Sequence, residues 1–141
     1  MSKKVEKAIN SNEILSATFN PFDYVISEND AREVAREIII TTINEDKLDF
    51  WYNAQISLLE SLILYVKYEH PKDANLNKVK QLLDEHGDTR SSMDALFDEL
   101  STEHPAFSAY TIVKKSPDPV INHILVGLEN TLANIHSTPV L

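Results

Sequence analysis

Apolar residues recur at steps of three and four along most of this chain, and that spacing places them on one face of an α-helix. The longest such segment covers residues 49–70 and carries the only Trp of the sequence. It stops before Pro71, because proline cannot continue a helix. We expect this helix to lie at the centre of the fold. Its apolar face would be formed by Trp51, Ala54, Leu58, Leu62, Tyr65 and Val66.

Trp51 is the residue on which this prediction depends most. A buried Trp truncated to Ala typically costs about 3–5 kcal/mol. If Trp51 is mostly buried against other helices, Trp51→Ala should therefore largely unfold a domain of this size.

A second long helix is predicted to begin near Ser27. Asp30 follows Ser27 by three residues, which resembles a capping box, and the apolar spacing then runs from Ala31 to Ile43. The run 38–43 is mostly β-branched and is also compatible with a strand. The helix is favoured because the spacing extends back well before that run.

Four shorter helices follow, each bounded by a capping or helix-breaking residue. These boundary residues are Asn75 and Gly87, then Ser91 or Ser92, then Pro105, and finally Pro119 and Pro139. Residues 1–18 are interpreted as a tail or weak helix, 19–25 as an extended entry segment, and 19–141 as one domain. The sequence predicts an all-α bundle of about six or seven helices with a central Trp-containing helix.

Composition narrows the functional classes. The chain has two glycines, and neither stands in the Gly-x-x-x-x-Gly-Lys-Ser/Thr loop that cradles phosphates, since Asp88 follows Gly87 and Leu128 follows Gly127. This chain alone is therefore not predicted to be an ATPase of that type. The absence of cysteine excludes disulfides and thiolate zinc sites. We predict no catalytic, cofactor-binding or metal residues.

Three Glu–His pairs could suggest a metal site: Glu69–His70, Glu85–His86 and Glu103–His104. Sequence neighbours point in different directions on a helix, however, whereas two ligands on one helix need a spacing such as i and i+4. Each pair precedes a proline or glycine that is expected to end a helix. We therefore interpret the histidines as caps at the negative C-terminal ends of helices.

The net charge of −9 arises from 22 acidic and 13 basic residues, and the basic residues are scattered. Duplex DNA binding requires a basic surface, so we do not expect it here. An acidic domain favours a basic protein partner. The densest acidic stretch is our candidate partner-binding surface, although each member could equally be a solvated helix position. It contains Asp84, Glu85, Asp88, Asp94, Asp98, Glu99 and Glu103.

Two segments together resemble the all-α domain of type IV coupling proteins, the TraG-like ATPases of conjugative secretion. The first is Asn20-Pro21-Phe22-Asp23-Tyr24, and the second runs from Phe50-Trp51 to Leu64-Tyr65. Weaker matches continue in the same order to the end of the chain. These are Val79-x-x-Leu82-Leu83, Asp94-x-Leu96-Phe97, Pro105-Ala106-x-x-x-Tyr110 and the final Thr138-Pro139-Val140-Leu141.

The resemblance implies a substrate-receptor module at the cytoplasmic face of the membrane, contacting a relaxase or an accessory transfer protein. It also implies that the chain is an insertion domain of a larger protein. That parent would be a membrane-anchored, hexameric ATPase, with ATP and Mg²⁺ bound outside this domain.

Two other classes remain open. The chain could be a stand-alone helical adaptor between proteins, which only the surrounding open reading frame would distinguish. A helical DNA-binding domain is the second alternative, and the acidic charge argues against it.

Overall fold

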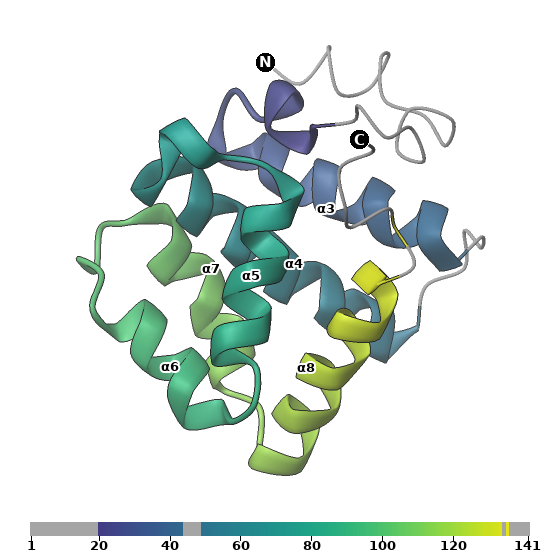
Figure 1. The fold of residues 1–141 in the computed structure, drawn as a ribbon. Coiled ribbons are helices and arrows are strands. Elements are labelled where there is room, and N and C mark those ends of the chain that lie inside the picture. Colours follow the sequence, from purple (N-terminus) through teal and green to yellow (C-terminus); the bar gives the residue numbers. More distant parts are fainter. Residues whose placement is uncertain (1–19, 44–48, 134, 136–141) are drawn as a thin grey trace.

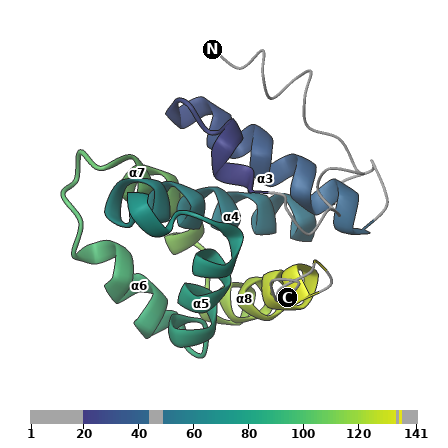
Figure 2. The ribbon, with the colours of Figure 1, turned by 45° about the horizontal axis from the view of Figure 1, so that its top comes forward.

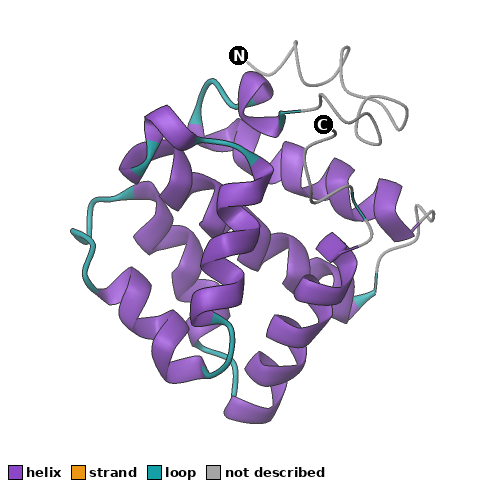
Figure 3. Cartoon of the chain, viewed as in Figure 1, coloured by secondary structure: helices purple, strands orange, loops and turns teal. Residues whose placement is uncertain are grey.

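The computed structural model describes residues 20–43, 49–133 and 135, and this part of the chain is helical without a strand (Figure 3). It contains six α-helices and two short 3₁₀ helices. The α-helices are α3 (Glu28–Ile43), α4 (Phe50–Glu69), α5 (Leu76–His86), α6 (Arg90–Asp98), α7 (Pro105–Lys114) and α8 (Asp118–Ala133). The 3₁₀ helices are η1 (Pro21–Tyr24) and η2 (Pro71–Asp73). The predicted all-α bundle is confirmed, including the helical state of 38–43.

Helix α4 is the centre of the bundle, as predicted. It contacts α7 and α3 most extensively, and also α8 and α5 (Figure 1). With neighbours on several sides, α4 buries more than one stripe. From Gln55 to Leu59 every side chain is buried, and so is every side chain from Ser61 to Leu64. This is the expected pattern for a core helix surrounded by others.

Trp51 lies outside this core, and its predicted burial was wrong. Its side chain is 37% exposed, in the first turn of α4, and its ring contacts His123 of α8 at a centroid distance of 4.3 Å. The buried positions of α4 begin one turn later, at Gln55. The apolar spacing shows which residues lie on the same face of a helix. It does not show how far along that helix the neighbouring helices extend. Trp51→Ala should therefore cost far less than complete unfolding.

The helix ends follow the capping residues in most cases. The Asp30 carboxylate accepts the backbone N–H of Ser27 at 3.0 Å, which is the returning half of the predicted capping box. Asn75 caps α5 by accepting the N–H of Lys78 at 2.8 Å. Pro105 is the first residue of α7, as expected. These local bonds fix where each helix begins.

Two predicted boundaries need correction. Thr89, not Ser91 or Ser92, caps α6: its hydroxyl accepts the Ser92 N–H at 3.1 Å, so both serines lie within the helix. The segment predicted to be extended forms η1, although Asn20 itself is extended, as the following proline requires. Helix α8 is described to Ala133, and Pro139, before which it was predicted to end, lies outside the described residues. The tail predicted over 1–18 lies outside the described residues.

The histidines of the three Glu–His pairs lie at different ends of their helices. His70 is the C-cap of α4 and His86 is the last residue of α5, as predicted. His104 instead caps the start of α7, because its Nδ1 accepts the Ala106 N–H at 3.0 Å. Its Nε2 lies 2.9 Å from the Glu69 carboxylate, which connects the end of α4 to the start of α7. The assignment of His104 to a helix C-terminus was therefore wrong.

Candidate functional site

The seven acidic residues proposed from the sequence as a partner-binding surface differ in their surroundings. They are distributed over α5, α6 and the segments that follow these helices, and several are held by neighbouring side chains. Asp98 accepts the Lys114 ammonium at 2.7 Å, and Glu85 accepts the Gln81 side-chain amide at 3.0 Å. Each of these contacts is exposed, so each contributes little to stability.

Asp94 has a structural role. One carboxylate oxygen accepts the Tyr110 hydroxyl at 2.6 Å, and the other accepts the Arg90 Nε at 3.1 Å. Tyr110 is only 2% exposed. Burial, followed by the hydrogen bond to Asp94, raises the pKa of the Tyr110 phenol well above its ordinary value. Asp94 is therefore occupied by internal partners and is a poor candidate for binding an external one.

Arg90 extends this network to two further elements. Its guanidinium donates to the carbonyl of Ser116 at 2.5 Å and to the carbonyl of Lys114, both at the end of α7, and to Asp118 at 2.9 Å at the start of α8. A cation at a helix C-terminus is favoured by the helix dipole. One arginine of α6 thus connects α7 and α8, and its side chain is unavailable to a partner. We call Arg90, Asp94, Phe97 and Tyr110 the α6–α7 seam.

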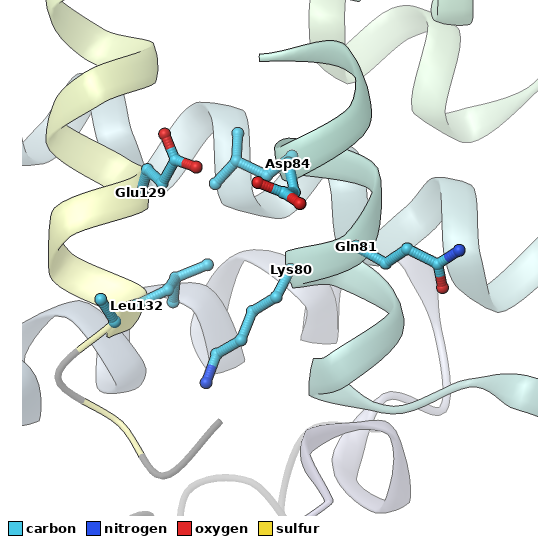
Figure 4. A pocket seen from close by; sticks show the side chains of 7 residues that line it. Lys80, Gln81, Asp84, Glu129 and Leu132 are labelled. Carbon is cyan, nitrogen blue, oxygen red and sulfur yellow. The ribbon is translucent and has the colours of Figure 1, made fainter. Parts of the chain in front are cut away.

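Asp84 belongs to a different environment. It lines a pocket of about 460 Å³ between α5 and α8, helices that lie side by side (Figure 2). Glu129 of α8 lines the same pocket, and Figure 4 shows the two side chains at one end of it. The other described lining residues are Lys80, Gln81, Leu83, Leu132 and Ala133. We call this pocket the α5–α8 groove.

Lys80 lies toward the other end of the α5–α8 groove. Its ammonium donates to the Ile135 carbonyl at 3.0 Å, and in Figure 4 it points away from Asp84 and Glu129. Partial burial lowers the pKa of Lys80. Sequence reasoning missed both Lys80 and Glu129. Glu129 is remote from Asp84 in sequence, and no local pattern signals that α5 and α8 pack together.

A second hollow, of about 280 Å³, lies beside the first turn of α4. Phe50 and Ile112 line it and are 61% and 65% exposed, and the Phe50 ring meets that of Trp51 at 5.0 Å. Arg32 is also at this hollow and pairs with Glu60 at 2.9 Å. Exposed aromatic residues are typical of protein interfaces. This hollow presents exposed aromatic and aliphatic side chains beside Arg32, whereas the described lining of the α5–α8 groove includes two carboxylates.

Neither pocket holds the constellation of a catalytic centre. Among the described residues there is no group of three or more acidic or histidine side chains placed to bind a metal ion. None of the described helices is long and apolar enough to cross a membrane.

Comparison with known proteins gives the assignment. The family model for type IV secretory system conjugative DNA transfer matches residues 4–126. No curated protein and no solved structure matches the chain. The family match covers most of the sequence and includes all seven acidic residues proposed from the sequence, whereas Glu129 lies just beyond it. The chain therefore belongs to the type IV secretion family of conjugative DNA transfer proteins, the TraG-like coupling proteins.

Proposed function

We propose that this chain is a non-catalytic receptor domain that binds proteins destined for conjugative transfer, such as a relaxase or an accessory transfer protein. The observation that carries the proposal is the family match over residues 4–126 of a chain whose described part is helical and whose sequence has no phosphate-binding Gly-x-x-x-x-Gly-Lys-Ser/Thr motif. A domain of the coupling-protein family without that loop has binding, not nucleotide hydrolysis, as its simplest role.

The charge supports a protein substrate over naked DNA. The net charge of −9 repels a phosphate backbone and attracts a basic protein. In this proposal ATP and Mg²⁺ are bound outside this domain, in a hexameric, membrane-anchored parent protein. This domain lies at the cytoplasmic face and binds no cofactor of its own.

A calorimetric titration with the relaxase of the same mobile element tests the proposal. Binding is expected, and it should weaken as salt rises because charge attraction is screened. A gel shift with duplex DNA, and an ATP turnover assay, are the two controls. Tight DNA binding at physiological salt, or no binding of any transfer protein, would contradict the receptor role.

The alternative of a stand-alone adaptor makes the same binding prediction but differs in gene context. A Gly-x-x-x-x-Gly-Lys-Ser/Thr motif encoded upstream in the same open reading frame identifies the domain as part of a coupling ATPase.

A further inference from the structure

Two carboxylates without a partner among the described residues line the α5–α8 groove. Asp84 and Glu129 line it from opposite helices, and neither forms a hydrogen bond or ion pair with another described residue. This distinguishes them from Asp94 and Asp98, which accept bonds from arginine, tyrosine and lysine side chains. Two carboxylates that line one groove favour a cationic ligand there.

Part of the groove is apolar, and Lys80 and Gln81 are the other polar residues of its described lining. Leu83 and Leu132, both buried, form part of the lining, together with the exposed Ala133. Lys80, the one cation among the described lining residues, donates to the Ile135 carbonyl and forms no ion pair with a described carboxylate. A volume of about 460 Å³ is in the range of pockets that hold small ligands or a few side chains. The groove therefore offers apolar contact and unneutralised negative charge together.

We propose that the α5–α8 groove binds a basic side chain of the transferred protein, with Asp84 and Glu129 as its acceptors and the apolar lining packing against the adjacent residues of that segment. This inference rests on the receptor role proposed above and adds the binding site and the chemistry of the bound segment. Arginine fits best, because its five N–H donors can serve carboxylates on both sides at once.

Charge reversal tests the acceptors. The variant Asp84→Lys/Glu129→Lys is compared with Asp23→Lys/Glu33→Lys, which changes net charge by the same amount at exposed positions outside the groove and outside the acidic stretch predicted from the sequence. Both pairs reduce long-range attraction, but only the first removes the acceptors. In calorimetric titration with the relaxase, we expect the groove variant to bind about tenfold more weakly than the control variant, the effect of losing one charge-assisted hydrogen bond.

Filling the groove tests the apolar lining without changing charge. Ala133→Trp places a large side chain at the pocket, and Ala95→Trp does so at another exposed helix position outside it. Binding should be lost in the first variant and retained in the second. Melting temperatures of all four variants show whether each is folded.

A peptide probe separates failure of the groove from failure of the receptor role. Amide chemical shifts of the 141-residue chain are followed while blocked Leu-Arg-Leu, or Leu-Gln-Leu as its uncharged control, is added. We expect shifts in α5 and α8 with the arginine peptide only. If the relaxase binds both charge-reversed variants equally, the groove is excluded and the receptor role stands. If no transfer protein binds, the receptor role fails, and absence of arginine-specific shifts then overturns the groove as well.

Discussion

Two acidic regions of this domain use their carboxylates in opposite ways. In the α6–α7 seam, Asp94 accepts bonds from Arg90 and Tyr110, and the three residues join α6 to α7. In the α5–α8 groove, Asp84 and Glu129 have no partner among the described residues. The residue types are similar, but the seam provides the Arg90 guanidinium and the Tyr110 hydroxyl as donors to Asp94, whereas Lys80 in the groove donates to the Ile135 carbonyl instead.

The difference shows how to find a binding surface on an acidic protein. Net charge counts every carboxylate equally, whereas only those without internal partners are available to an external one. A carboxylate that is already hydrogen-bonded would have to break that bond first, which costs about as much as the new bond returns. The seam should therefore govern stability, and the groove should govern binding. Substitutions in each region test that division.

The largest effect on stability is expected from the seam's aromatic core. Phe97 is 1% exposed and stacks on Tyr110 with ring centroids 4.2 Å apart. Phe97→Ala removes this contact and leaves a cavity, so we expect a loss of about 3–5 kcal/mol in the free energy of unfolding. Urea denaturation measures it, with Phe97→Leu as the milder control. A loss below about 0.5 kcal/mol, the scale of surface substitutions, would show that the seam is not core.

The next effect concerns the hydrogen bond of Tyr110. Tyr110→Phe keeps the ring and removes the hydroxyl that donates to Asp94 at 2.6 Å. A hydrogen bond to a charged group contributes about 1.5–3 kcal/mol, and we expect a loss of that size. Thr111→Val is the matched control, because it removes a hydroxyl whose bond, to the Phe107 carbonyl at 3.0 Å, lies within one helix. Equal losses in the two variants would contradict a special role for the seam.

The same tyrosine gives a pH dependence. Burial and the bond to Asp94 raise the pKa of Tyr110 above its ordinary 10.0, so the folded state keeps the proton when the unfolded state loses it. Stability from this group is complete below pH 10 and falls as pH rises above that value. Wild type should therefore lose stability more steeply than Tyr110→Phe in alkaline urea titrations. Parallel slopes for the two proteins would refute this assignment.

The sequence predicts the helices better than it predicts these two regions. Three-four spacing and capping residues locate each α-helix of the described residues, because both signals are local. The surroundings of Asp84 and Asp94 depend on α8 and α7, which come from distant parts of the sequence. No local sequence pattern shows that these helices pack beside them. Trp51 shows the same limit. Its spacing matches the buried face of α4, but the helices that bury this face do not cover the first turn, where Trp51 lies.

A smaller effect is expected where α8, one wall of the groove, meets α4. A Cβ at Gly127 would lie 2.7 Å from Nε2 of Gln55, whose Oε1 accepts the Thr131 hydroxyl at 2.7 Å. Gly127→Ala gains about 1 kcal/mol of helix propensity, but it displaces this buried amide at a cost of about the same size. Stability should hardly change.

A second variant, Gln55→Ala, separates the gain in helix propensity from the cost of displacing the Gln55 amide. In Gln55→Ala the clash is absent, and Gly127→Ala should then stabilise the protein by the full propensity gain of about 1 kcal/mol. Urea denaturation of the four proteins in this cycle measures the coupling. The same gain in both backgrounds would mean that Gln55 moves aside without cost and does not fix the position of α8.

The smallest effect on stability is expected in the groove itself. The comparison of Asp84 with Asp94 is the most direct test of the difference between the two regions. Asp84→Asn removes a charge that has no described partner, so the free energy of unfolding should change by no more than about 0.5 kcal/mol. Asp94→Asn is the matched control, since the same exchange weakens bonds to both Arg90 and Tyr110 and should be clearly destabilising. Relaxase affinity should show the reverse order, with the larger loss for Asp84→Asn. If Asp84→Asn destabilises the protein as much as Asp94→Asn does, Asp84 has a structural role, and the contrast between seam and groove fails.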